Sequence, residues 1–353
     1  MPPLGYREGE EPACWHDLQE VTHGPYDRKA GSGAGIGAGA LLGTKKKINI
    51  FICLIGLSSF SLWILYTRLT EFCIFCEKRQ NATFPPWTLR RSDESFLLLP
   101  EADCHKNPPF LVLLVTSSVP RADARMAIRQ TWGKERTVAG RRIVAYFLLG
   151  TTANPRQQAG VVAESQEYKD VIQKNFTDTY YNLTLKTMMG IEWVHKYCPQ
   201  SSFVMKTDSD VFVNVFYLTE LLVRKNKNSS FFTGFLKAHE YPIRKPGSKW
   251  YVSNEEYPGD TYPPFCSGTG YVLSTDVASK IYEISGSVRF IKLEDVFVGL
   301  CLDKLKIQLE ELHSEQTFFP ARIQFSVSRF KKIVMCHEVK PSEQLSYWNS
   351  LVA

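Results

Sequence analysis

Continuous apolar runs, each about as long as a strand, mark the folded part of the chain. The first two are Phe110–Thr116 and Ile143–Gly150, and both end in small residues. Strands covered on both faces of a sheet show this pattern, because neither face meets water. Helices are predicted for Ala122–Thr131 and for Tyr180–His195, which leads into a third apolar run at Phe203–Val213. The alternation of strands and helices predicts an α/β fold, in which ligands bind beyond the carboxyl ends of the strands.

A different apolar run lies near the N-terminus. Ile48–Tyr66 is 19 residues long and uncharged, and Lys45–Lys47 precede it. At about 1.5 Å per residue, a helix of this length spans the roughly 30 Å hydrocarbon core of a bilayer. A cleavable signal peptide begins with only a short charged region, whereas 47 residues precede this run. It is therefore predicted to be a transmembrane signal anchor. The lysines would stay cytosolic, although Arg68 on the other flank weakens the charge asymmetry.

The anchor divides the chain into four predicted parts. Residues 1–47 form a cytosolic tail, of which residues 1–44 lack apolar periodicity and are expected to be disordered. The anchor itself is residues 48–66. Residues 67–103, with Pro85-Pro86 and scattered charges, are expected to form a lumenal stem. Residues 104–353 have the composition of a packed domain.

Glycosylation acceptors and cysteines agree with a lumenal domain. Four acceptor triplets follow the anchor and none precedes it, at Asn81, Asn175, Asn182 and Asn228. Five cysteines lie in the predicted domain: Cys104, Cys198, Cys266, Cys301 and Cys336. An oxidising lumen favours disulfides among them, but the pairing cannot be derived from spacing. Cys73 and Cys76 have the spacing of half a zinc site, and no second half follows nearby.

Composition and charge narrow the possible functions. Hydrophobic residues make up 44% and aromatic residues 13% of the 353 residues, which is enough for a large core. The net charge of +6 and the pI near 8.7 are mild, and the basic residues are scattered. Nothing in this pattern indicates binding to nucleic acid.

Two carboxylates at the end of the third apolar run suggest a metal site. Asp208 and Asp210 are one residue apart, and in a strand such residues point to the same side while Ser209 points away. Hard cations such as Mn²⁺ and Mg²⁺ prefer oxygen ligands and commonly share a few carboxylates with substrate phosphates. Asp-x-Asp pairs also occur in solvated turns, but the apolar flanks here anchor this pair in a core.

Five segments together resemble the β-1,3-galactosyltransferase family. They are Arg125–Gly133, Tyr181–Thr187, Lys206–Asp210, Pro263–Tyr271 and Leu293–Gly299. The resemblance covers roughly Phe96 to the end, whereas residues 1–44 do not resemble the short tail of that family. It implies a type II Golgi membrane enzyme with a GT-A fold, a Rossmann-like nucleotide-sugar-binding domain. It further implies UDP-galactose as donor, Mn²⁺ as cofactor, and β-linked GlcNAc, or sometimes GalNAc, as acceptor.

Roles for the acidic residues follow from this resemblance and from the chemistry. Galactose is α-linked in the donor and β-linked in the product, so one displacement needs one base and a stabilised leaving group. Asp210 is expected to bind the metal directly, with Asp208 acting through water or the ribose. By analogy with related enzymes His337 is another ligand, and a surface histidine is the alternative. Asp295 is the expected base and Glu294 its rival or an orienting residue, whereas a helix cap would also explain both.

Further positions are assigned to substrate binding. Donor contacts are expected from Arg129, Trp132, Lys134, Lys186, Asp208, Ser209, Gly268, Thr269 and Gly270. For Arg129 and Lys134 the alternative is a helix end with solvated cations. For Gly268 and Gly270 the alternative is a tight turn. Trp250 and Tyr251 are expected to stack on an acceptor sugar, although aromatic core residues are commoner.

Two other functions remain open at this point. A lectin-like or chaperone-like relative could keep the fold without turnover, but the intact Asp208, Asp210 and Asp295 favour catalysis. A β-1,3-N-acetylglucosaminyltransferase would differ only in its donor, and the wording of the motifs favours galactose. The motifs do not decide between glycolipid, N-glycan and mucin-type acceptors.

Overall fold

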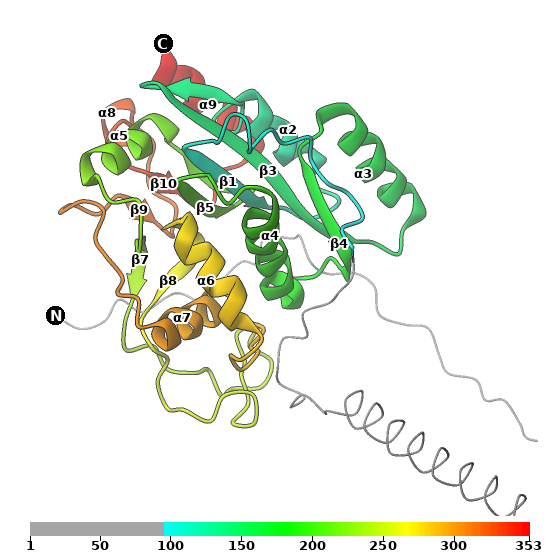
Figure 1. The fold of residues 1–353 in the computed structure, drawn as a ribbon, viewed down its shortest axis with the longest axis vertical. Coiled ribbons are helices and arrows are strands. Elements are labelled where there is room, and N and C mark those ends of the chain that lie inside the picture. Colours follow the sequence, from blue (N-terminus) through cyan, green and yellow to red (C-terminus); the bar gives the residue numbers. More distant parts are fainter. Residues whose placement is uncertain (1–94) are drawn as a thin grey trace, which may run out of the picture. The chain divides into compact units, whose positions relative to one another are not determined.

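The computed structural model describes residues 95–353, and its core is one mixed sheet of seven strands (Figure 1). The sheet order is β2-β3-β1-β5-β8-β7, and β4 also pairs with β3. The strands are β1 (Leu111–Thr116), β2 (Arg136–Val138), β3 (Arg141–Thr151), β4 (Val171–Thr177), β5 (Phe203–Asp208), β7 (Phe232–Lys237) and β8 (Phe265–Ser274). β1, β3, β4 and β5 are parallel, whereas β8 runs antiparallel to both β5 and β7. The predicted α/β fold is confirmed as a mixed α/β fold with a Rossmann-like sheet.

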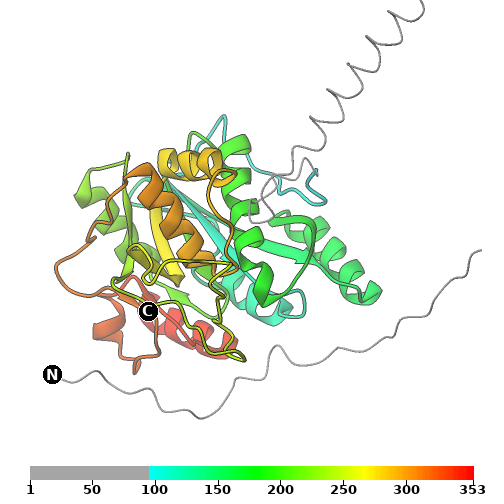
Figure 2. The same ribbon diagram turned by 90° about the horizontal axis from the view of Figure 1, so that it is seen from below.

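Helices cover both faces of this sheet (Figures 1 and 2). They are α2 (Ala122–Gln130), α3 (Pro155–Tyr168), η1 (Tyr180–Asn182), α4 (Leu183–Tyr197), α5 (Val215–Lys225), α6 (Thr275–Ser285), α7 (Glu294–Leu305), α8 (Val327–Phe330) and α9 (Pro341–Val352). Residues of α4, α6 and α7 join one hydrophobic cluster, and residues of α2, α5 and α9 join the other. β1 contributes Leu111, Leu113 and Val115 to the second cluster and Val112 and Leu114 to the first. Its continuous apolar sequence therefore reflects burial on both faces.

A small second sheet brings the end of the chain beside the end of β5. Its order is β6 (Phe212–Val213), β10 (Met335–Cys336) and β9 (Phe318–Phe319). Cys336 pairs with Phe212, and the Val339 N–H donates to the Asp210 carbonyl at 2.8 Å. His337 lies between Cys336 and Val339 in this C-terminal segment and is thereby placed next to the turn that carries Asp210.

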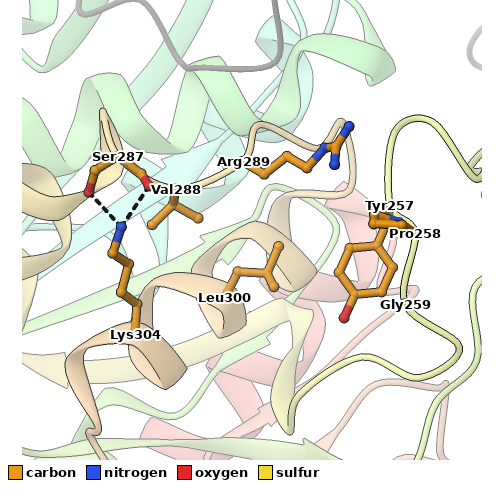
Figure 3. A pocket seen from close by; sticks show the side chains of 8 residues that line it. All are labelled: Tyr257, Pro258, Gly259, Ser287, Val288, Arg289, Leu300 and Lys304. Atoms are coloured by element: carbon orange, nitrogen blue, oxygen red, sulfur yellow. Dashed lines mark hydrogen bonds between the residues drawn. The ribbon is translucent and has the colours of Figure 1, made fainter. Parts of the chain in front are cut away.

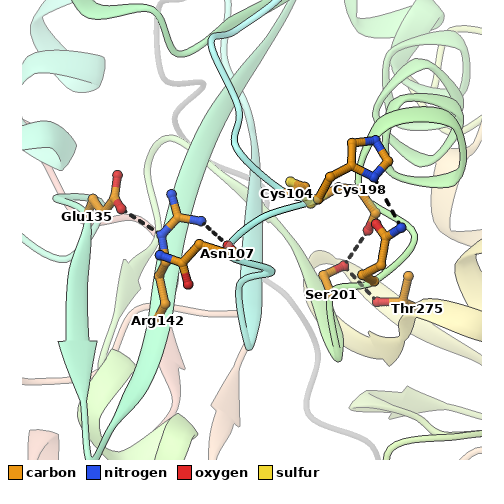
Figure 4. The surroundings of a disulfide bond; sticks show 9 residues. Cys104, Asn107, Glu135, Arg142, Cys198, Ser201 and Thr275 are labelled. Carbon is orange, nitrogen blue, oxygen red and sulfur yellow. Dashed lines mark hydrogen bonds and ion pairs between the residues drawn. A yellow bond between two sulfur atoms is a disulfide. The ribbon is translucent and has the colours of Figure 1, made fainter.

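One disulfide joins the segment before β1 to the end of α4. Cys104 and Cys198 are bonded across a sequence separation of 94 residues, and Ser201 Oγ donates to the Cys198 carbonyl at 2.8 Å (Figure 4). This pair confirms the prediction of a disulfide among the five domain cysteines. Among the described residues the other three, Cys266, Cys301 and Cys336, are buried free thiols.

Several predictions fall before the described part of the chain. The predicted tail (1–47) and anchor (48–66), most of the predicted stem, and Asn81, Cys73 and Cys76 lie outside it. Within residues 95–353 no helix is both long enough and apolar enough to cross a bilayer. The last residues assigned to the stem do contact the domain, because Leu98 bridges to Gln173 of β4 and the Phe96 ring packs on Tyr197.

Candidate functional site

Asp208, Asp210 and His337 form a group that could hold a metal ion. One ligand atom from each lies within 4.8 Å of the others. Asp208 is the last residue of β5, and Asp210 lies in the turn that follows. The two carboxylates therefore converge as predicted, but through the turn rather than through the alternation of a continuous strand.

The surroundings of His337 leave one ring nitrogen facing the carboxylates. Nδ1 lies 3.0 Å from the Pro320 carbonyl, which can only accept, so Nδ1 carries a hydrogen. Nε2 lies 3.3 Å from Asp210 Oδ2. Burial lowers the pKa of His337, but the hydrogen bond to Asp210 and its charge outweigh burial and raise the pKa to about 9. His337 is thus not a solvated surface histidine, and two carboxylates with one imidazole suit a divalent cation such as Mn²⁺.

A buried lysine links this group to the second pair of acids. The Lys206 side chain is buried, and its Nζ lies 2.8 Å from Asp208 Oδ1 and 3.4 Å from Glu294 Oε2. It also donates to the Gly268 carbonyl. Burial lowers the pKa of Lys206, but the charges of Asp208 and Glu294 outweigh burial and raise it. Sequence reasoning assigned Lys206 no role, although its position two residues before Asp208 in a strand puts both on one side.

Glu294 and Asp295 begin α7 and have different surroundings. Glu294 is buried, and Tyr271 Oη donates to its Oε1 at 2.6 Å. Burial raises the pKa of Glu294 to about 7. Asp295 is partly exposed to solvent. Its carboxylate accepts from the Gly268 N–H at 3.1 Å and from the Val296 N–H at 2.9 Å. Burial also raises the pKa of Asp295. Two backbone donors thus orient Asp295, while Glu294 is engaged by protein side chains.

Gly268, Thr269 and Gly270 lie inside β8 and not in a tight turn. A Cβ on Gly268 would come within 2.9 Å of Glu294 Oε2, and one on Gly270 would overlap the Met335 sulfur. The Thr269 carbonyl accepts from Thr207 Oγ1 at 3.2 Å. These glycines make room for the protein's own side chains, and their place in a strand rules out the alternative of a tight turn. Contact with the donor stays a prediction.

Two further positions assigned to the donor, Trp132 and Arg129, are held by other side chains of the protein. Trp132 is fully buried, and its Nε1 donates to Gln344 at 2.6 Å. Arg129 is held by ion pairs of 2.7 Å with Glu164 and 2.8 Å with Asp170.

Lys134 lies two residues before Arg136, the first residue of β2, which pairs with Ile143 of β3, level with Leu111 at the start of β1. Asp208 pairs with Thr116 at the other end of β1. Arg129 and Trp132 are thus engaged within the protein, Trp132 through Gln344, whose Nε2 donates to the Val211 carbonyl beside the acidic turn at 3.1 Å. The donor contacts expected from Arg129, Trp132 and Lys134 stay predictions.

Lys186 and Ser209 do lie at the acidic edge of the sheet. Lys186 is buried, and its Nζ donates to Asp178 Oδ1 at 2.8 Å and to the Ser117 carbonyl, just beyond β1, at 2.6 Å. Burial lowers its pKa. The Ser209 N–H donates to the Thr116 carbonyl at 3.0 Å. In the structure both residues fix the loop and turn that follow the strands, and their donor contacts stay predictions.

The predicted acceptor residues belong to a long connection between β7 and β8. Trp250 is 48% exposed and Tyr251 is half-buried. The Trp250 side chain hydrogen-bonds the Tyr180 hydroxyl, and burial and then the charge of Asp295 raise the pKa of Tyr180. The aromatic side chains thus lie near the catalytic candidate and are not core residues.

Two of the three described glycosylation acceptors are exposed, Asn175 on β4 and Asn228 in the connection after α5. Asn182 Nδ2 donates to the Thr177 carbonyl at 2.8 Å, and Thr184 of the same triplet is buried. The folded chain therefore presents Asn175 and Asn228 more openly than Asn182.

A cavity of about 400 Å³ lies along the far half of α7 (Figure 3). It is lined by Tyr257, Pro258, Gly259, Ser287, Val288, Arg289, Leu300 and Lys304. None of the residues predicted for catalysis, metal or substrate lines it. Lys304 Nζ is held there by the Ser287 carbonyl at 2.7 Å.

Comparison with known proteins identifies the family. The family model described as Galactosyltransferase matches residues 123–313. The chain is 58% identical over 302 residues to beta-1,3-galactosyltransferase 5 of Pan paniscus, covering 86% of this chain and 97% of that protein. It is 59% identical over 266 residues to the Mus musculus protein of the same name, covering 75% and 86%. It is 44% identical over 252 residues to beta-1,3-galactosyltransferase 2 of Homo sapiens, covering 70% and 60%. The chain belongs to the galactosyltransferase family, together with these β-1,3-galactosyltransferases.

Proposed function

We propose that this protein transfers galactose from UDP-galactose, in β-1,3 linkage, to a terminal GlcNAc or GalNAc of a glycan. The fold is proposed to be of the GT-A type, and the enzyme to be a type II Golgi membrane protein with a lumenal domain. The names of its relatives support the donor and the linkage. The observation that carries the chemistry is the Lys206 ammonium, which contacts both Asp208 of the candidate metal group and Glu294 beside Asp295.

Asp295 is the residue best placed to act as base. Its carboxylate is oriented by two backbone N–H groups, and its raised pKa makes it a better proton acceptor than an ordinary aspartate. It takes the proton of the acceptor 3-hydroxyl as that oxygen attacks the anomeric carbon. The bond from this carbon to the UDP oxygen breaks, and its electron pair stays on the diphosphate. Attack from the face opposite the leaving group gives the β product.

The diphosphate would be held at the acidic group. Asp210, Asp208 and His337 offer two carboxylates and an imidazole nitrogen to a cation, which we propose is Mn²⁺. When bound, it would neutralise charge on the departing diphosphate. Glu294 serves as an orienting residue in this scheme, because Tyr271 and Lys206 occupy its carboxylate.

The test uses the full-length protein purified in detergent. Transfer from UDP-galactose, UDP-GlcNAc and UDP-GalNAc to a β-GlcNAc glycoside is measured with and without Mn²⁺, and NMR determines the linkage. We expect Mn²⁺-dependent Galβ1-3GlcNAc. Asp295→Asn should lower kcat by roughly 10²–10⁴-fold, as loss of a general base does. Asp303→Asn, an exposed acid near the other end of α7, is the matched control.

Each other outcome would change a different part of the proposal. Near-normal kcat in a folded Asp295→Asn protein would remove the base assignment. Transfer from UDP-GlcNAc alone would indicate a β-1,3-N-acetylglucosaminyltransferase. UDP binding without any transfer would favour a lectin-like or chaperone-like relative. The lumenal orientation is tested in cells by Asn175→Gln and Asn228→Gln, which should each remove one glycan and speed migration of the protein on a gel.

A further inference from the structure

Beside Asp295 lies a cluster of aromatic rings and lysines, most of which neither the sequence nor the chemistry above assigned. We call it the aromatic platform, and it consists of Tyr180, Tyr181, Lys249, Trp250, Tyr251 and Lys292. Its residues come from η1, from the β7–β8 connection and from the segment before α7. Tyr181 is 55% exposed and Trp250 is 48% exposed. Large rings this open to solvent and grouped together are typical of a binding surface.

Lysines join the rings of different segments. Lys249 Nζ lies 4.6 Å from the centre of the Trp250 ring and 6.0 Å from that of Tyr180. Lys292 Nζ lies 5.7 Å from the centre of the Tyr181 ring and 5.6 Å from that of Tyr251. Ammonium groups at these distances are attracted to ring faces. Each lysine therefore ties η1 to the β7–β8 connection.

Hydrogen bonds to backbone carbonyls hold the segments that carry the platform; one of them is buried and four are partly buried. Thr184 Oγ1, at the start of α4, donates to the Ile291 carbonyl at 2.9 Å. The Arg244 guanidinium donates to carbonyls across the β7–β8 connection, those of Val252, Ser253, Tyr257 and Gly259. The rings are thus fixed before any ligand arrives, which reduces the entropy lost on binding.

The platform is continuous with the catalytic candidate. Lys292 is three residues before Asp295 in the chain. Tyr180 and Tyr181 are packed edge to face, with ring centres 5.9 Å apart, and Tyr180 feels the charge of Asp295. An acceptor sugar whose 3-hydroxyl reaches Asp295 fills the space next to that carboxylate. The exposed ring of Tyr181 is then available to the sugar that precedes it in the glycan.

We propose that the aromatic platform, with Tyr181 at its exposed end, binds the penultimate sugar of the acceptor. This inference rests on the proposed function and makes an oligosaccharide the preferred substrate over a single GlcNAc. Aromatic side chains can stack on the apolar face of a sugar ring, and the lysine ammonium groups can donate to sugar hydroxyls.

The test compares methyl β-GlcNAc with methyl GlcNAcβ1-3Gal as acceptors of the full-length protein. We expect kcat/KM to be higher for the disaccharide, and Tyr181→Ala to lower the ratio of the two values about tenfold, as loss of one stacked ring does in other ligand sites. Tyr181→Phe keeps the ring and should keep the ratio. Tyr197→Ala, an exposed tyrosine at the other end of α4, is the matched control and should also keep it.

An unchanged ratio in Tyr181→Ala, or an equal loss with both acceptors, would overturn the assignment. If the wild-type protein transfers to neither acceptor, the proposed function fails, and saturation-transfer NMR then judges the platform separately. Saturation of the inner-galactose protons that is lost in Tyr181→Ala supports the platform. Its absence in the wild-type protein refutes it.

Discussion

The Lys206 ammonium is the group on which the candidate site depends most. It contacts Asp208 on β5, the Gly268 carbonyl on β8 and Glu294 on α7, and its side chain is 3% exposed. Lys206→Met keeps a flexible side chain of similar length and removes the charge together with the N–H donors. The substitution therefore leaves Asp208 and Glu294 without their common buried counter-ion.

The size of the effect follows from these contacts. Removing one partner of a buried ion pair costs about 3–5 kcal/mol, because the other charge stays buried and unpaired. Glu294 can limit the loss by binding a proton, since its pKa is already about 7 and Lys206 lowers it. We therefore expect a loss of about 3 kcal/mol, the lower end of that range. At 2–4 °C per kcal/mol for a domain of this size, Tm should fall by roughly 6–12 °C.

The assay pairs thermal unfolding with transfer kinetics. Because Lys206 orients Asp208, the substitution should also lower kcat/KM by roughly 10–100-fold, the usual effect of losing a residue that supports a metal ligand. Lys174→Met is the matched control. Lys174 is another buried lysine, 2.8 Å from Glu192 on the side of β4 and α4, so its loss should lower Tm without lowering kcat/KM at 25 °C.

Two results would refute this reasoning. In Lys206→Met, a Tm within about 2 °C of the wild-type value would mean that the loss of the buried Lys206 contacts costs much less than about 3 kcal/mol. An equal fall of kcat/KM in Lys174→Met would mean that the activity reports general destabilisation. Glu294→Gln added to Lys206→Met should restore part of the Tm, because it removes the unpaired carboxylate.

The remaining predictions concern stability. The disulfide closes a loop of 94 residues, so Cys104→Ala/Cys198→Ala should lower the free energy of unfolding by about 4–5 kcal/mol in urea, and an unchanged value would contradict the chain-entropy account. Gly160→Ala in α3 adds a methyl group into open space and should stabilise by about 0.4–1 kcal/mol, whereas Gly299→Ala in α7 places Cβ 2.6 Å from a neighbouring Cβ and should destabilise by about 1–3 kcal/mol. Burial raises the pKa of Glu164, but its arginine partners outweigh burial and lower it below the ordinary 4.5. This stabilisation is complete above pH 4.5 and is lost as the pH falls through the folded-state pKa, so the fall of Tm on acidification should be smaller in Glu164→Gln.

The sequence revealed three strands that are buried over most of their length. β1, β3 and β5 were found because strands covered on both faces have uninterrupted apolar sequences. β8 was not predicted as a strand, and Gly268 and Gly270 were assigned to the donor, with a tight turn as the alternative. These glycines are required by contacts with Glu294 and Met335, which lie far away in the chain. A contact of this kind leaves no local pattern.

The donor positions around α2 show a second limit of the sequence. Arg129 and Lys134 were grouped with the phosphate site because they flank a motif and carry positive charge. In the structure Arg129 is held by Glu164 and Asp170, which lie more than 30 residues further along the chain, and such partners leave no local pattern. Lys206 shows the reverse case. Its spacing from Asp208 could have placed it in the site although it was assigned no role, whereas its buried position and its contact with Glu294 required the fold.

The balance of charge at the site gives the metal proposal its physical basis. Four carboxylates gather there, from Asp208, Asp210, Glu294 and Asp295, and the cations among them are Lys206 and a protonated His337. Formal charges therefore leave an excess of two negative charges before the diphosphate of a donor adds more. Partial protonation of Glu294 near pH 7 reduces this excess but does not remove it. A divalent cation between Asp208, Asp210 and His337 would replace the Nε2 proton of His337 and reduce the formal excess from two negative charges to one, at the place where the substrate charge must also be accommodated. The Lys186–Asp178 pair is already neutral and offers nothing further.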